Sequence, residues 1–396
     1  MELLRSILDW QYKHNQDRAS KKTSIMATSL SVDVSDDLDQ LALDYNHPNF
    51  SKFLNCSGCN FTNESGYQQN TGDGVSNNDW MFYVILWMYV TPSVFGLISI
   101  VGVCGNALVI YVILSQPSMR TVTNILLFNL AVSDIAFLLF TVPFTAYKYA
   151  AFSWDFGDLF CKMVQFFLYV CTYVTVWTLV AISGYRYLTV VRSTTSARYR
   201  TKSNVIICCL CIWGTSLGSQ IPVLLAHTVK TMGVYSYCGI TTSAVEAVFL
   251  TFFVFAYVLP LLLICVLYVP IMWHLRPSKT STVDNAHSKE RTARACKVII
   301  LVVVVFCISW LPLHINSLVA TYGTLPRGKF YEVFRVLWNC MAYGNSCANP
   351  FIYNYASKEF RKAFHDVLCC YSCKKARRNG EAKTQSELTK MVTAHS

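Results

Sequence analysis

The feature that most constrains the fold of this chain is a series of seven apolar blocks that contain few charged residues. They cover approximately residues 83–114, 122–149, 159–191, 204–226, 243–274, 295–321 and 331–355. A helix of about 20 apolar residues is long enough to cross a bilayer. Only 14% of the 396 residues are charged, against about 25% in soluble proteins. We therefore predict an all-α membrane protein with a seven-transmembrane helix bundle over residues 83–355. A cytosolic enzyme, a disordered chain and a secreted disulfide-framework domain are excluded.

The formal charge of +11 is concentrated between alternate blocks and after the last one. The basic residues of these segments are Arg120, Arg192, Arg198, Arg200, Lys202, Arg276, Lys279, Lys289, Arg291, Arg294, Lys374, Lys375, Arg377 and Arg378. Basic loops on one side of a bundle mark the cytoplasmic side and are not a nucleic-acid footprint. We predict a multi-pass plasma-membrane protein with its N-terminus outside and its C-terminus inside, and no nucleic-acid partner.

Residues 1–82 are predicted to form an extracellular, glycosylated and largely disordered tail. Four Asn-x-Ser/Thr acceptors for N-glycosylation lie close together, at Asn49, Asn55, Asn60 and Asn63. Cys161 and Cys238 also fall on the predicted outer side, which is oxidising, so we predict a disulfide between them. Whether Cys56 and Cys59 pair in the same compartment is left open.

The segment after the seventh block predicts a short eighth helix over residues 356–373. Its apolar side chains share one face, which suits a helix lying on the inner membrane surface in contact with lipid: Phe360, Phe364, Val367 and Leu368. Three cysteines follow, and palmitoylation is a better explanation of them than a metal site: Cys369, Cys370 and Cys373. Residues 374–396 then form a cytoplasmic tail.

Polar residues recur inside the apolar blocks, where they are costly and usually functional. The set that we single out is Asp134, Thr175, Asn345 and Asn349. A carboxylate among hydroxyls and amides can hold a sodium ion or a shuttling proton, or the group can simply bind helices together by hydrogen bonds. Sodium is the one ion expected, as a modulator, and no cofactor is expected. Five prolines interrupt the blocks and favour kinked helices: Pro143, Pro222, Pro260, Pro312 and Pro350.

An ordered set of motifs runs through the blocks. They are Gly105-Asn106, Leu130-Ala-Val-Ser-Asp134, Cys161, Arg186-Tyr187, Trp213, Pro260 with Tyr268, Phe306-Cys-Ile-Ser-Trp-Leu-Pro312 and Asn349-Pro-Phe-Ile-Tyr353. Together they resemble the rhodopsin-like (class A) G protein-coupled receptors. The resemblance implies an activation switch formed by Arg186, Tyr187, Tyr268, Phe306, Trp310, Pro312, Asn349, Pro350 and Tyr353. It also implies that a heterotrimeric G protein and arrestin bind on the cytoplasmic side.

Two absences narrow the ligand class. Residues 331–355 contain no Lys to anchor retinal, and Leu168 stands where amine receptors carry an aspartate. The segments Arg198-Tyr-Arg-Thr201 and Tyr343-Gly-Asn-Ser-Cys347, with His314, are most similar to the allatostatin-A receptors, which are similar to the galanin receptors. This implies a receptor for an extracellular, amidated neuropeptide and no enzyme. The alternatives are a rhodopsin-like receptor for another neuropeptide and, more distantly, a polytopic membrane transporter.

Polar and aromatic residues toward the outer ends of the spans are predicted to bind the peptide through amide hydrogen bonds and aromatic stacking. They are Gln165, Tyr169, Glu246, His314, Asn339 and Tyr343. The chain departs from the family pattern beside Arg186, since Tyr185 replaces the usual acid and Thr292 stands where some relatives have a second one. This predicts raised basal signalling, unless hydrogen bonds or a cation–π contact replace the missing carboxylates.

Overall fold

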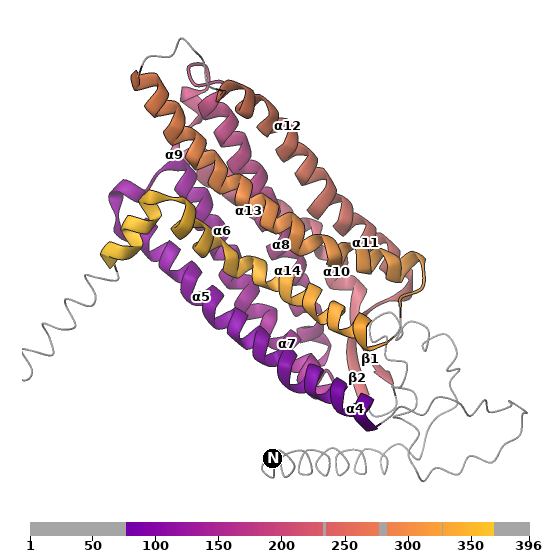
Figure 1. Ribbon diagram of the computed structural model, residues 1–396. Helices are drawn as coiled ribbons and strands as arrows, with labels where there is room; N and C mark the ends of the chain where they lie inside the picture. The colour runs from indigo at the N-terminus through magenta and orange to yellow at the C-terminus, as the bar shows by residue number, and fades with distance from the viewer. Residues whose placement is uncertain (1–76, 233–234, 277–282, 327, 368–396) are drawn as a thin grey trace, which may run out of the picture.

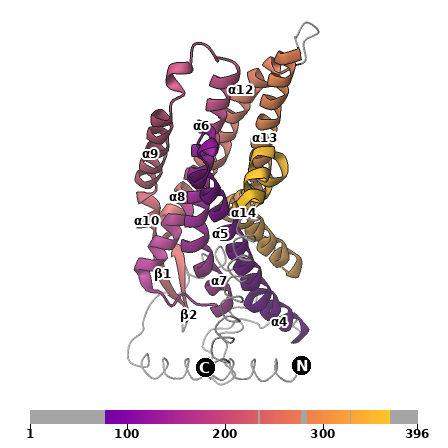
Figure 2. The same ribbon diagram turned by 90° about the vertical axis from the view of Figure 1, so that its left-hand side faces the viewer.

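A computed structural model describes residues 77–232, 235–276, 283–326 and 328–367. The described chain is an elongated bundle of long helices with one two-stranded hairpin at one end (Figures 1 and 2). We call this end the hairpin end and the other the opposite end. The four predicted glycosylation sites, the Cys56–Cys59 pair and the three predicted palmitoylation sites lie outside the described residues.

Each predicted block corresponds to one helical span. The spans consist of α4 (Asn77–Val84), η1 (Ile85–Val90) and α5 (Thr91–Ser115); α6 (Val122–Phe140) and α7 (Val142–Ala151); α8 (Gly157–Val190); α9 (Lys202–Ser219) and α10 (Ile221–Ala226); α11 (Val245–Phe253), η5 (Val254–Val258) and α12 (Leu259–His274); α13 (Val283–Tyr322); and α14 (Lys329–Ala356). Three short 3-10 turns, η2 (Pro117–Met119), η3 (Ala197–Tyr199) and η4 (Thr242–Ala244), lie in the connections.

Six of these spans are apolar enough to cross a membrane by length and composition. The seventh, α14, is long enough but is more polar, because it carries the charged and amide residues that face the bundle interior. Its amides Asn345 and Asn349 are only 4% and 1% exposed.

The predicted prolines explain most of the interruptions. The second span breaks at Thr141 before Pro143, and the fourth breaks at Gln220 before Pro222. A π-helical stretch, η5, precedes Pro260 in the fifth span. Proline lacks an N–H group and collides with the preceding turn, so the ladder of helical hydrogen bonds shifts or stops there. The helices α13 and α14 continue through Pro312 and Pro350.

The apolar block predicted at about residues 295–321 agrees with the membrane span Thr292–Tyr322, but the sixth helix is longer than this block. Helix α13 begins at Val283. Hydropathy marks only the part of a helix that lies in lipid, whereas polar helix formers extend it into water. An exposed ion pair one turn apart, Arg294 to Glu290 at 3.0 Å, lies on this extension.

The hairpin that follows the fourth span was not predicted. Strands β1 (His227–Met232) and β2 (Tyr235–Ile240) are antiparallel, with Val229 opposite Cys238. The predicted disulfide between Cys161 and Cys238 is present and ties β2 to the start of α8. A second attachment lies beside it, because Asp158 Oδ1 accepts hydrogen bonds from the backbone N–H of Val229 (2.9 Å) and the hydroxyl of Thr228 (2.8 Å).

The predicted eighth helix is present over residues 358–367, the last part of the described chain. Its Phe360 and Phe364 are 3% and 6% exposed. The ring of Phe360 lies 5.4 Å from that of Tyr353, centroid to centroid. Both phenylalanines therefore pack against the end of α14 within the core, whereas we had expected them to face lipid.

Close packing of the first, second and seventh spans depends on Gly102. A Cβ atom at this position would lie 2.5 Å from Leu138 Cδ1 and 2.8 Å from Cys347 Sγ. Gly102→Val should therefore destabilise the bundle by about 1–3 kcal/mol, the usual cost of overpacking. Thermal unfolding of the purified protein measures this effect. Gly96→Val, in the same helix, is the control, because nothing lies within 4 Å of its Cβ position. Equal stability of the two variants would contradict the packing assignment.

Candidate functional site

A cavity of about 190 Å³ opens at the hairpin end, between the hairpin and the ends of α7, α11, α13 and α14. We call it the hairpin cavity. Its polar lining includes Lys148, Lys230, Asn316, Tyr331, Arg335 and Asn339. Three of these residues are cationic, which gives the described part of the cavity a positive lining.

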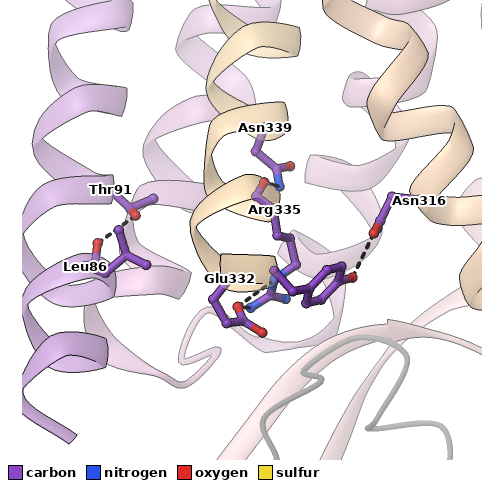
Figure 3. Close-up of polar contacts among 7 residues, drawn as sticks. Leu86, Thr91, Asn316, Glu332, Arg335 and Asn339 are labelled. Atoms are coloured by element: carbon purple, nitrogen blue, oxygen red, sulfur yellow. Dashed lines mark hydrogen bonds and ion pairs between the residues drawn. The ribbon is translucent and has the colours of Figure 1, made fainter. Parts of the chain in front are cut away.

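An ion pair on α14 stands at the wall of the hairpin cavity (Figure 3). Arg335 donates from Nε and Nη2 to Glu332 Oε2, at 2.9 and 2.6 Å. The side chains of Arg335 and Glu332 are only 13% and 1% exposed. Asn339 donates to the Arg335 carbonyl oxygen at 2.8 Å, and Tyr331 donates to Asn316 Oδ1 at 2.7 Å.

Sequence reasoning missed Glu332 and Arg335. The signal was present, because two opposite charges three residues apart inside a membrane span lie on one helix face and are costly unless paired. Lys148 and Lys230 carry no such signal, since only the folded chain brings α7 and the hairpin to the same cavity.

The structure separates the six residues predicted to bind the ligand. Asn339 lines the hairpin cavity. Glu246 is exposed on α11 and accepts a hydrogen bond from Tyr322 at 2.9 Å, while Gln165 is half-buried on α8. Tyr169, His314 and Tyr343 are buried in ring packing. Tyr343 lies apart, against Phe95 and Phe137.

A column of aromatic rings continues from Tyr169 toward the middle of the bundle. The ring of Phe252 lies 4.6 Å from Tyr169, 4.7 Å from His314 and 6.0 Å from Trp310, centroid to centroid. Trp310 in turn lies 6.1 Å from Phe306. These contacts join α8, α11 and α13, so a displacement at one ring changes the packing of the next.

The four residues predicted to hold an ion lie in the core of the bundle. Asn349 Nδ2 donates to Asp134 Oδ2 at 2.8 Å, and the hydroxyl of Thr175 lies 3.2 Å from that of Ser133. Four buried side-chain oxygens of Asp134 and the nearby amides have no hydrogen-bond partner: Asp134 Oδ1, Asn345 Oδ1, Asn349 Oδ1 and Asn106 Oδ1. Buried oxygens that lack donors are costly, and they are the ligands that a hard cation prefers. The donor set therefore fits a sodium ion.

A larger cleft of about 400 Å³ opens at the opposite end of the bundle. We call it the Arg186 cleft, since Arg186, Thr292 and Tyr353 line it. Arg186 Nε and the hydroxyls of Tyr268 and Tyr353 have no hydrogen-bond partner. The structure thus brings three of the predicted switch residues to this end, with polar atoms available for new contacts.

This arrangement, with a cavity at each end of one bundle, suits transmission between the two ends. Groups of three or more His, Cys, Asp or Glu residues that could hold a metal ion do not occur in the part of the chain that the structure describes. Pro312 lies in α13 between Trp310 and His314, two residues of the ring column.

Comparison with known proteins agrees with this geometry. Residues 105–353 match the family model described as 7 transmembrane receptor (rhodopsin family). The chain is 38% identical over 293 residues to the allatostatin-A receptor of Bombyx mori, covering 71% of this chain and 80% of that protein. It is 37% identical over 308 residues to galanin receptor type 1 of Homo sapiens, covering 76% and 87%. It is 36% identical over 291 residues to galanin receptor 2b of Danio rerio, covering 73% and 77%.

Proposed function

The chain belongs to the rhodopsin family of seven-transmembrane receptors, and from this membership we propose that it is a neuropeptide-activated receptor that couples to a heterotrimeric G protein. The names of its relatives support a peptide of the allatostatin-A or galanin class. The observation that carries the proposal is the pair of cavities at the two ends of one bundle, with the ring column packed in the bundle core.

We propose that the hairpin end faces outside and the Arg186 cleft faces the cytoplasm. The disulfide at the hairpin end requires an oxidising compartment, and the basic loops lie toward the opposite end. This orientation puts the glycosylation acceptors outside. Cys369, Cys370 and Cys373 follow the helix over 358–367 in the sequence, and on the cytoplasmic side palmitoyl chains on them would attach this part of the chain to lipid.

The mechanism is a shift between two packings of the same helices. A peptide that binds the hairpin cavity better in one packing increases the population of that packing. Repacking of Phe252, His314 and Trp310 then tilts α13 about Pro312. The tilt widens the Arg186 cleft, which accepts the end of a Gα subunit and afterwards arrestin. Interfaces of this kind switch between discrete arrangements and do not deform continuously.

The decisive experiment is ligand-stimulated nucleotide exchange on purified Gα. The chain is reconstituted in lipid nanodiscs and tested with a panel that contains synthetic allatostatin-A and galanin peptides in amidated form. At least one peptide should accelerate exchange. Arg186→Ala is the matched control, because it should retain peptide binding and lose exchange. If no peptide stimulates exchange, the proposal is contradicted, and ion movement across a liposome membrane would instead identify a transporter.

We further propose that Asp134, Thr175, Asn345 and Asn349 hold a sodium ion that stabilises the inactive packing. The support is the group of buried oxygens without donors. By the reciprocity of linked binding, raising sodium should then lower peptide affinity. Asp134→Asn should abolish that dependence in a radioligand titration, with choline chloride as the ionic-strength control. Persistence of the effect in the Asn variant would mean that the cluster only holds helices together.

A further inference from the structure

We propose that Arg335 is the anchor for an oxygen acceptor of the peptide, a carbonyl or a carboxylate, and that Glu332 and Trp87 are positioning residues that hold its guanidinium at the hairpin cavity. The inference rests on the proposed function and names the ligand group that the hairpin cavity recognises. Three observations carry it: the burial of the ion pair, the donors that the pair leaves available, and the ring that covers the guanidinium.

The ion pair is buried to an unusual degree for one that lies at the end of a helix. Glu332 is 1% exposed, and Arg335 is 13% exposed and lines the hairpin cavity, whereas Glu332 lies behind it. Taking two charges out of water costs several kcal/mol, so a buried pair contributes little to stability in itself. A pair of this kind is better explained by what its cation can bind.

The guanidinium retains donors for a ligand. Arginine has five N–H donors in a planar fork. Two of them point to the single oxygen Glu332 Oε2. Among the residues that the structure describes, Arg335 has no second hydrogen-bond acceptor, and its remaining donors belong to the side chain that lines the hairpin cavity. A planar donor fork of this kind binds carboxylate or carbonyl oxygens with fixed geometry.

Trp87 covers one face of the guanidinium. Arg335 Cζ lies 5.1 Å from the centroid of the Trp87 ring, which is within the range of a cation–π contact. Trp87 comes from the π-helical stretch η1, and Thr91 donates to the carbonyl oxygen of Leu86 at 2.7 Å in this irregular turn (Figure 3). Such π-helical insertions commonly re-aim a side chain at a functional site. The Glu332 carboxylate fixes the edge of the Arg335 guanidinium, and the Trp87 ring fixes its plane.

The rest of the hairpin cavity favours the same ligand chemistry. Lys148 from α7 and Lys230 from β1 line it together with Arg335. The polar groups Asn316 and Tyr331 bind each other, and the Asn339 amide is held by the backbone of Arg335. A ligand oxygen that approaches this wall therefore meets cationic donors from three elements.

The role of Arg335 is tested on the full chain with synthetic allatostatin-A and galanin peptides. Each peptide is used as the C-terminal amide and as the free acid. Single-alanine analogues are then made of the peptide that activates the chain. Arg335→Ala should raise the concentration for half-maximal G protein activation at least about tenfold at matched surface expression. Arg335→Lys should recover only part of this loss, because it restores the charge and not the fork. Lys329→Gln, an exposed cation on the same helix, is the control and should leave potency unchanged.

A double-mutant cycle tests the positioning role of Glu332. Glu332→Gln should lower potency in the unaltered chain and have no additional effect in the Arg335→Ala background, because it acts only through Arg335. A residue that is merely structural would instead lower potency and surface expression equally in both backgrounds. An alanine analogue whose loss of potency is not worsened by Arg335→Ala identifies the peptide residue whose oxygen Arg335 binds. Comparison of the amide and acid forms shows whether that oxygen is at the C-terminus or inside the peptide.

The outcomes separate the two proposals. If no peptide activates the unaltered chain, the receptor function itself is overturned, and the anchor with it. If the unaltered chain responds and Arg335→Ala responds equally, only the anchor is overturned. Additive effects of Glu332→Gln and Arg335→Ala overturn the positioning role. If Arg335→Ala does not reach the surface, Arg335→Lys decides, since full potency in that variant overturns the requirement for the guanidinium fork.

Discussion

Replacing Cys161 and Cys238 together by alanine is expected to lower peptide potency by a factor of about 30 or more. The disulfide holds β2 to α8, and the hairpin supplies Lys230, Tyr237 and Ile240 to the hairpin cavity. Loss of a native disulfide commonly costs about 2–5 kcal/mol, and each 1.4 kcal/mol that reaches the binding equilibrium is about tenfold. The measurement is the half-maximal peptide concentration for G protein activation at matched surface expression.

The control is Cys104→Ala, since Cys104 is an exposed free cysteine on α5. A further comparison uses the second attachment of the hairpin. Asp158→Ala, which removes the acceptor oxygen, should have a small effect while the disulfide is present and a larger one in the double-alanine background, because the two attachments hold the same strand pair. Unchanged potency without the disulfide would mean that the hairpin does not shape the ligand site.

The seven spans could be predicted from the sequence because the bilayer imposes them. Every backbone group in lipid must be satisfied within the segment, so an uncharged block of sufficient length has one structural solution. This constraint does not apply to segments outside the membrane. It could not show that α13 extends to Val283 or that residues 227–240 form a hairpin, because neither depends on burial in lipid.

The positions of the motif residues could be predicted from the sequence, whereas those of the ligand-binding residues could not, and the reason is physical. Motif residues such as Asp134, Arg186 and Asn349 fall at fixed places on helices, so their meeting in the core or at the Arg186 cleft could be anticipated. The ligand residues depend on how far each helix is rotated and where the hairpin rests. His314, for example, is 2% exposed within the ring column, whereas Arg335 of the neighbouring α14 lines the hairpin cavity.

The surroundings of Arg186 bear on whether the chain signals without a ligand. An arginine at this end of a bundle is restrained when a carboxylate accepts its hydrogen bonds. Among the described residues, no carboxylate forms an ion pair with Arg186, and its Nε has no hydrogen-bond partner. Tyr185 is half-buried close to Cys208 and Cys209 of α9, and the described part of the chain shows no cation–π contact to Arg186.

Tyr185→Asp is therefore expected to lower ligand-free signalling about tenfold while leaving peptide binding largely intact. A tyrosine side chain is uncharged at pH 7, whereas an aspartate next to Arg186 would supply a charge-assisted hydrogen bond worth about 1.5–3 kcal/mol. If about 1.4 kcal/mol of this favours the inactive packing, the active fraction falls about tenfold.

Ligand-free nucleotide exchange on Gα is compared between the unaltered chain and the variant in nanodiscs. Tyr185→Asn is the matched control, because it has nearly the shape of aspartate without its charge and should leave basal exchange high. A silent unaltered chain would show that other contacts restrain Arg186, and an equal decrease in the Asn variant would show that the charge is not the cause.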